Sequence, residues 1–173
     1  MKVSDLKKYI RDVPNFPKEG IIFKDISTLL KDPEAFQKSI DTLAKAFKKA
    51  RVRYVVGVEA RGFIFGAALA YKLKAGFVPV RKKGKLPYKT KSVTYQLEYG
   101  VDTLEIHTDA IPPHSRVLVV DDLLATGGTV RAVTDLLKKQ KAKIVGVAFL
   151  VELEFLKGKE KLKNLPIYSV IRY

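Results

Sequence analysis

The sequence of 173 residues contains no cysteine. This absence excludes a disulfide framework, a thiolate metal site and a cysteine nucleophile. No apolar run approaches the roughly 18 residues of a transmembrane helix, and the first residues lack the apolar core of a signal peptide. We therefore expect a cytoplasmic protein with no membrane partner.

Acidic residues are scarce as well, with 18 Asp and Glu against 33 Lys and Arg, so the net charge is +15. Such a charge favours polyanionic partners, either nucleic acid or phosphorylated small molecules. The basic residues are spread along the chain, and no nucleic-acid-binding motif accompanies them. We expect no specific nucleic-acid partner; the alternative is general nucleic-acid binding, which would retain the protein on DNA at moderate salt without sequence preference.

Apolar runs alternate with helical patterns along the chain, which predicts one α/β domain over residues 1–173. Strands are expected at 54–58, 76–80, 117–120, 143–151 and 167–171, and helices at 62–74, at 129–139 and from Asp32 onward. Ser4 is expected to cap a short N-terminal helix. The alternation favours a mostly parallel, twisted sheet flanked by helices on both faces, and the N-terminal segment is expected to cover the site.

Residues 81–107 depart from this pattern. They begin with the basic residues Arg81, Lys82, Lys83 and Lys85, and apolar residues then alternate with polar ones on both sides of Gly100. The alternation predicts a hairpin that turns near Gly100 and is preceded by a flexible loop. A basic run of this kind is, by itself, more typical of a solvated face than of a binding site.

The most specific signal is the run Val117-Leu-Val-Val-Asp-Asp-Leu-Leu-Ala-Thr-Gly-Gly-Thr129. Its four apolar residues suit a strand that is covered on both faces. Asp121 and Asp122 follow at the carboxyl end of this strand, where open α/β sheets bind ligands. The small residues Ala125, Thr126, Gly127, Gly128 and Thr129 lead into a helix, so backbone N–H groups and the helix N-terminus can bind a phosphate there.

The two acids indicate which phosphate compound fits. A carboxylate repels a phosphate but accepts hydrogen bonds from neutral hydroxyl groups beside it. A ribose 5-phosphate meets both conditions, with its phosphate on residues 125–129 and its 2- and 3-hydroxyl groups on Asp121 and Asp122. The run is neither a Walker A loop nor a dinucleotide-binding glycine motif; the alternative is a turn with solvated acids.

This run resembles the phosphoribosyl pyrophosphate (PRPP) binding motif of type I phosphoribosyltransferases, in the variant of the adenine phosphoribosyltransferases. Residues 16–27, 59–66 and 81–87 with 97–100 agree with that family in the same order. The resemblance implies the type I fold, with a small hood at residues 1–30 and a flexible catalytic hairpin. It implies a homodimeric glycosyltransferase of purine salvage that converts adenine and PRPP into AMP and pyrophosphate.

The resemblance also assigns the pyrophosphate site. Glu59, Ala60 and Arg61 match the family's pyrophosphate loop, which often holds a non-proline cis peptide, here at Glu59–Ala60. Arg61 offers a planar fork of donors; the alternative is a surface ion pair with Glu59. Arg81, Lys82 and Lys85 are expected to stabilise the leaving pyrophosphate, partly across a dimer interface. Mg²⁺ is expected to be carried by PRPP, without a direct protein ligand.

Two segments are assigned to the base. Glu98 has apolar neighbours that would raise its pKa, and the resemblance places it near N7 of adenine as general acid and base; the alternative is a hairpin-tip acid that faces water. Ile21, Ile22, Phe23 and Lys24 are expected to bind adenine, although Phe23 suits the core equally well. Lys24 stands where many relatives have arginine, and lysine cannot make the same flat stack.

Two other functions would keep this fold. A phosphoribosyltransferase for xanthine, hypoxanthine, guanine or orotate would share the PRPP motif, but the Glu98 hairpin and residues 16–27 argue against it. A non-catalytic sensor of PRPP or nucleotides could lose Glu98 or the basic loop, and this chain has both.

Overall fold

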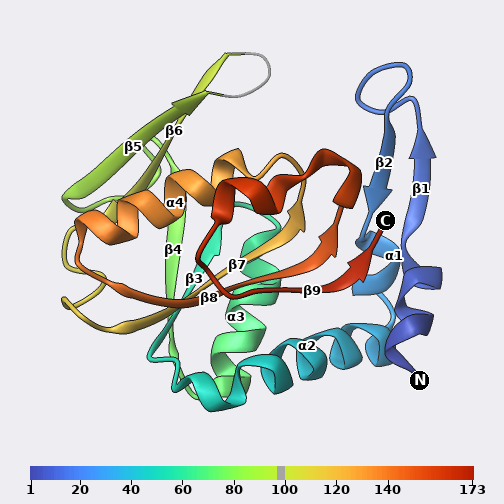
Figure 1. Cartoon of the computed structure of the whole chain (residues 1–173), viewed down its shortest axis with the longest axis horizontal. Coiled ribbons are helices and arrows are strands. Elements are labelled where there is room, and N and C mark those ends of the chain that lie inside the picture. The colour runs from blue at the N-terminus through green and yellow to red at the C-terminus, as the bar shows by residue number, and fades with distance from the viewer. Residues whose placement is uncertain (97–99) are drawn as a thin grey trace.

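A seven-stranded sheet forms the centre of the molecule in a computed structural model that describes residues 1–96 and 100–173 (Figure 1). The strand order is β5-β6-β4-β3-β7-β8-β9. The five strands from β4 to β9 run parallel, and β6 and β5 add an antiparallel edge. The expected mostly parallel α/β sheet is confirmed. The strands are β3 (Tyr54–Val58), β4 (Gly76–Lys82), β5 (Thr90–Gln96), β6 (Val101–His107), β7 (Arg116–Leu124), β8 (Lys143–Glu152) and β9 (Ile167–Arg172).

Helices cover both faces of this sheet. Helices α2 (Pro33–Phe47) and α3 (Gly62–Leu73) pack on one face, and α4 (Gly128–Lys139) packs on the other. Successive strand residues point to opposite faces, so Leu118 and Val120 of β7 join the first core while Val117 and Val119 join the second. The four consecutive apolar residues of β7 are thus explained, since each face of the strand is buried.

The N-terminal segment forms a separate two-stranded sheet of β1 (Arg11–Pro14) and β2 (Ile22–Asp25) beside the main sheet (Figure 1). The short helix before it is a 3-10 helix, η1 (Val3–Tyr9), and the expected cap at Ser4 is wrong. The Asp5 carboxylate accepts the Lys2 N–H at 3.0 Å, so the helix begins after Lys2 instead. The remaining short helices are α1 (Ser27–Leu30), η2 (Lys48–Ala50), η3 (Glu154–Leu156) and η4 (Gly158–Leu162).

Several boundaries follow directly from local sequence signals. The Asp32 carboxylate accepts the Ala35 N–H at 2.8 Å, and Pro33 occupies the first position of α2. Strands β5 and β6 pair from Thr90 opposite His107 to Gln96 opposite Val101, as the alternating pattern predicts. Among the described residues, no helix is long and apolar enough to cross a membrane.

Candidate active site

The carboxyl ends of β3 and β7 lie side by side, because the two strands are parallel neighbours with Gly57 opposite Val120. The loop of residues 59–61 therefore leaves the sheet next to Asp121 and Asp122. Gly62, at the start of α3, permits this approach: a Cβ there would lie 2.8 Å from Asp121 Oδ1 and 3.0 Å from the Val120 carbonyl oxygen. The sheet thus brings together two segments that sequence analysis assigned to one site.

A cavity of about 430 Å³ opens at this edge. It is lined by residues from the loop after β3, from the hairpin and from the end of β7: Val58, Glu59, Ala60, Arg61, Lys82, Tyr95, Asp102, Leu104, Asp121, Asp122, Leu123 and Thr129. Among these are predicted members of the ribose, phosphate and pyrophosphate sites. The cavity is therefore the candidate active site.

Asp121 and Asp122 lie within β7, which continues to Leu124 because its ladder with β8 runs past both acids. Asp121 Oδ1 accepts the Asp122 N–H at 2.9 Å. Burial raises the pKa of Asp121 well above its ordinary value, and the neighbouring charge of Asp122 raises it further. Burial also raises the pKa of Asp122, against the opposing effect of the Arg61 guanidinium. Ionising these buried carboxyls is therefore costly, and a ligand that donates hydrogen bonds to them would offset that cost.

Arg61 connects the PRPP motif to the N-terminal sheet. Its Nε lies 2.8 Å from Asp122 Oδ2, and its guanidinium carbon lies 5.2 Å from the centre of the Phe23 ring. The preceding Glu59–Ala60 peptide bond is cis, as the family resemblance implies. Arg61 thus pairs with Asp122 rather than with Glu59, and it stands between the ribose residues and an aromatic ring predicted to bind adenine.

Glu59 organises the basic residues of the next strand and loop. Its carboxylate accepts hydrogen bonds from Lys85 Nζ at 2.7 Å, from Arg81 Nε at 3.2 Å and from the Lys82 N–H at 3.1 Å. Burial raises the pKa of Glu59, but these donors outweigh it and lower the pKa to about 2. A carboxylate so engaged positions Arg81 and Lys85; it would itself repel pyrophosphate.

Lys82 has a different partner. Its Nζ lies 3.2 Å from Asp102 Oδ2 of β6, and this hydrogen bond raises the pKa of Lys82. Both side chains line the cavity. Lys82 is therefore a cation at the edge of the cavity, in reach of an anionic ligand.

The predicted phosphate loop has the geometry of an anion site. Gly127 adopts a left-handed conformation, with φ of 78°, at the N-cap of α4, and it has no side chain to accept from the first helical turn. The N–H groups of that turn are left for a ligand. Residues 123–130 surround a small hollow of about 70 Å³ together with Asp121.

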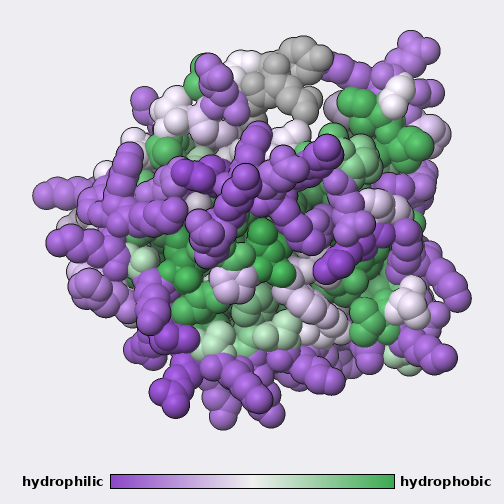
Figure 2. Space-filling model, in the orientation of Figure 1, coloured by the Kyte–Doolittle hydropathy of each residue, from purple (hydrophilic) through white to green (hydrophobic). Residues whose placement is uncertain are grey.

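Two of the residues predicted to bind adenine, Phe23 and Lys24, are neighbours on β2 and therefore point to opposite faces of the strand. Phe23 packs edge-to-face on Phe16 at 5.1 Å between ring centres. Ile21 and Ile22 are 45% and 55% exposed, and Figure 2 shows apolar atoms gathered over this end of the N-terminal sheet. Lys24 points elsewhere: its Nζ lies 2.7 Å from Asp12 Oδ1 and 4.0 Å from the centre of the Tyr173 ring.

Five cavity residues were missing from the sequence-based site: Val58, Tyr95, Asp102, Leu104 and Leu123. Tyr95 and Asp102 are opposite one another in the β5–β6 ladder, so their side chains share a face. The alternating pattern gave the strands, but only the packing of the hairpin against α4 identifies which face meets the cavity. Glu98, the predicted general acid and base, lies outside the described residues.

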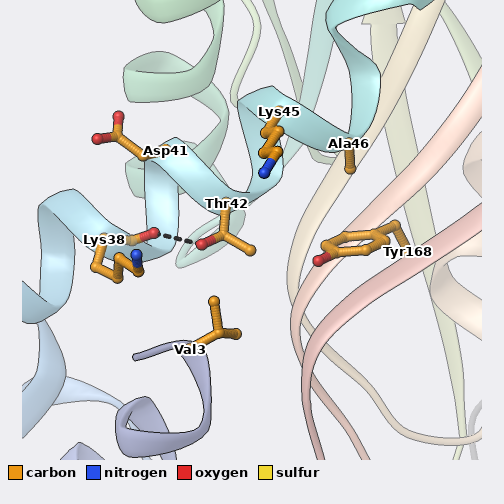
Figure 3. A pocket seen from close by; sticks show the side chains of 7 residues that line it. All are labelled: Val3, Lys38, Asp41, Thr42, Lys45, Ala46 and Tyr168. Atoms are coloured by element: carbon orange, nitrogen blue, oxygen red, sulfur yellow. Dashed lines mark hydrogen bonds between the residues drawn. The ribbon is translucent and has the colours of Figure 1, made fainter. Parts of the chain in front are cut away.

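A second cavity, of about 490 Å³, lies between α2, η1 and β9 (Figure 3). Two of its polar side chains have partners in the protein: Thr42 Oγ1 donates to the Lys38 carbonyl oxygen at 2.7 Å, and Asp41 pairs with Lys72 at 2.8 Å. No residue predicted for binding or catalysis lines it. It therefore does not compete with the cavity at the sheet edge.

Comparison with known proteins identifies the family of this chain. Residues 25–170 match the phosphoribosyl transferase domain family. The adenine phosphoribosyltransferase of Syntrophotalea carbinolica is 58% identical over 99% of this chain and 100% of its own length.

Solved structures give the same result. The adenine phosphoribosyltransferase of Thermoanaerobacter pseudethanolicus superposes with a TM-score of 0.96 at 50% identity, over 99% of this chain and all of its own. The Saccharomyces cerevisiae enzyme, complexed with D-2,5-dideoxy-2,5-imino-altritol 1,6-bisphosphate and adenine, superposes with a TM-score of 0.91 at 45% identity, over 97% of each chain.

Proposed function

This chain belongs to the adenine phosphoribosyltransferases of the phosphoribosyltransferase family, and we propose that three groups of its residues divide the reaction among them. The chain transfers the phosphoribosyl group of PRPP to adenine in purine salvage and gives AMP and pyrophosphate. The observation that carries the residue assignment is the single cavity in which Arg61, Lys82, Asp121, Asp122 and Thr129 meet.

The first group holds the ribose 5-phosphate. The N–H groups at the start of α4 bind the 5-phosphate, with Ala125, Thr126, Gly127, Gly128 and Thr129 as the loop. Asp121 and Asp122 accept hydrogen bonds from the ribose hydroxyl groups. As the bond from C1 to pyrophosphate breaks, the sugar gains oxocarbenium-like positive charge, and the carboxylates stabilise it.

The second group receives the leaving pyrophosphate. When pyrophosphate binds, the Arg61 guanidinium leaves the Asp122 carboxylate and contacts pyrophosphate oxygens instead. Lys82, Arg81 and Lys85 supply further positive charge. Glu59 and Asp102 hold these three side chains in place before pyrophosphate binds. Positioned cations of this kind favour the transition state because negative charge grows on the leaving group. Glu59 and Ala60 line the same cavity, and their backbone adds polar groups to the subsite.

Mg²⁺ fits this arrangement as a companion of the substrate. It commonly binds through one or two carboxylates plus substrate phosphates and keeps several waters. Among the described residues, no group of three or more His, Cys, Asp or Glu side chains could hold a metal ion. We propose that PRPP brings the ion to the site, where it neutralises charge on the pyrophosphate.

The third group binds and protonates the base. Phe23 offers a ring face near Arg61, and Ile21 and Ile22 line the same end of the N-terminal hood, which residues 1–30 form over the site. Lys24 contributes by fixing β2 through Asp12 and Tyr173 rather than by touching the base. Glu98 handles the proton of adenine at N7 while N9 attacks the sugar.

The test is pyrophosphate release from PRPP and Mg²⁺ with adenine, hypoxanthine, guanine, xanthine or orotate in parallel. We expect release with adenine alone. Release with another base would leave the PRPP site intact but contradict the adenine pocket. PRPP binding without release, with any base, would indicate a sensor.

A homodimer is the expected assembly, and the exposed side of α3 supports it. This helix is apolar on almost every side, and a helix of that kind is normally buried all round. Ile64 and Tyr71, which share one side of the helix, are nevertheless 41% and 88% exposed. A second copy of the chain would cover this side and lie next to Arg61, where the helix begins.

We expect the double substitution Ile64→Asp, Tyr71→Asp to convert the dimer to a monomer, because each charge would be buried at the interface. Light scattering after gel filtration measures the mass. Phe155→Asp is the matched control, since Phe155 is 69% exposed on η3. A dimer that persists in the double variant, or dissociates only in the control, contradicts the assignment.

We propose a cytoplasmic location for the enzyme; a chain without cysteine does not need an oxidising compartment to form disulfides. Phosphorylated substrates account for the net charge of +15, so a nucleic-acid partner is not needed to explain it.

A further inference from the structure

The hairpin contacts the phosphate loop through one side chain that the family motif does not assign. The hydroxyl oxygen of Tyr95, on β5, lies 3.3 Å from Thr129 Oγ1 in the first turn of α4. The neighbouring Gln96 carbonyl oxygen lies 3.8 Å from where a Cβ of Gly128 would stand. The end of β5 therefore lies over the N-terminus of α4, as the two elements do in Figure 1.

The position of Tyr95 follows from the strand pattern. Val93 and Tyr95 lie on the same side of β5, and both pack against the core that includes Val130 and Val133 of α4. The ring is thereby held among apolar side chains, and its hydroxyl group reaches the polar cavity. Tyrosine suits this position because its body is apolar while its tip can donate and accept hydrogen bonds.

We propose that Tyr95 is part of the 5-phosphate subsite, where its hydroxyl and that of Thr129 act as a pair toward the phosphate. This proposal rests on the proposed function of the phosphate loop. Each of the two hydroxyl groups has one O–H donor, and the hydrogen bond between them engages only one of these two donors. The other donor is left for an acceptor, and a phosphate oxygen can only accept. Either direction of the Tyr95–Thr129 bond therefore leaves one donor aimed at the ligand.

The protonation state of Tyr95 supports this role. Burial raises the pKa of its hydroxyl, and the charges of Asp102 and Asp121 act in the same direction, against the Thr129 hydrogen bond and Lys82. The hydroxyl stays neutral at physiological pH and remains a donor beside an anion. A hydrogen bond to a charged acceptor contributes more than one between neutral groups.

The test compares ligands that differ only in the phosphate. In Tyr95→Phe we expect the dissociation constants of ribose 5-phosphate and AMP to rise about tenfold, and the KM for PRPP to rise with them. The affinities for adenosine and pyrophosphate, and the KM for adenine, should stay as in the wild type. Isothermal calorimetry on the full chain measures binding directly, so the result does not depend on turnover.

Tyr88→Phe is the matched control, because Tyr88 is 56% exposed before β5 and contacts His107 instead. A double-mutant cycle with Thr129→Val should show coupling to Tyr95→Phe and none to Tyr88→Phe. Unchanged AMP binding, or an equal loss for AMP and adenosine, would overturn the proposal. A wild type that binds ribose 5-phosphate but makes no AMP would instead contradict the proposed function.

Discussion

Replacing Asp121 and Asp122 together by asparagine is expected to lower kcat/KM for AMP synthesis by about 10³-fold, as when charged groups that act on a transition state are removed. Asparagine keeps the size of each side chain but loses the negative charge. It also replaces one carboxylate oxygen by an amide donor, which cannot accept from a ribose hydroxyl. Asp122→Asn further removes the partner of Arg61 at 2.8 Å.

The stability of the Asp121→Asn variant should rise, although its activity falls. The pKa of Asp121 is raised in the folded state, chiefly by burial. A group with a raised folded pKa contributes its stability below its unfolded pKa, and this contribution is lost as the pH rises through the folded pKa. The wild type therefore loses stability as the pH rises from below 4 through this raised pKa, and Asp121→Asn removes that loss.

We accordingly expect Asp121→Asn to raise the thermal midpoint by about 2–4 °C at pH 7–8, the shift that roughly 1 kcal/mol produces in a domain of this size. The gain should shrink as the pH falls and should vanish below about 4, because the wild-type carboxyl is then protonated in both states. Differential scanning fluorimetry across this range measures it.

Asp135→Asn is the control for both readouts, since Asp135 forms a surface pair with Arg131 at 2.8 Å on α4. It should leave activity and midpoint nearly unchanged. Near-wild-type turnover in the double variant would contradict the ribose assignment. A lower midpoint for Asp121→Asn at pH 8 would contradict the burial of an unfavourable charge.

The strand that carries these two acids could be predicted from the sequence pattern alone. The pattern Val117 to Val120 identified a strand because every residue in it is apolar, and this requires only the local chain. It also located the acids at a ligand-binding edge, because parallel strands end together. The ribose assignment thus depended on local order along the chain and on one general rule of topology.

Partners that are distant in sequence could not be predicted in the same way. Lys85 and Glu59 are 26 residues apart, and their contact depends on β3 and β4 being neighbours. Lys24 was expected at the base because the family resemblance assigns residues 21–24 to adenine, yet strand alternation directs it to Asp12 and to Tyr173 at the far end of the chain. For Tyr95 the sequence predicted a place in an alternating strand but not the contact with Thr129, because the two residues are 34 positions apart.

The phosphate loop depends on a backbone contact of the same long-range kind, and Gly127→Ala tests it. Gly127 has a φ of 78°, and a Cβ there would overlap the carbonyl oxygen of Gly158 in η4. A Cβ on Gly158 would in turn overlap the Ala125 carbonyl oxygen. Each backbone thus occupies the space beside the other, and neither can move aside as a flexible side chain would.

We expect Gly127→Ala to weaken PRPP binding by about 10²-fold, because the loop must open and its N–H groups then miss the phosphate. The KM for PRPP and the calorimetric affinity for ribose 5-phosphate measure this loss.

Gly20→Ala separates the overlap from the strain of positive φ, since Gly20 has a φ of 82° and nothing within 4 Å of the added Cβ. Both variants should lose about 1 kcal/mol of stability to the left-handed conformation, but only Gly127→Ala should lose PRPP. Equal PRPP affinity in the two variants would contradict the prediction, because it would show that the overlap with Gly158 does not move the N–H donors of the loop away from the phosphate.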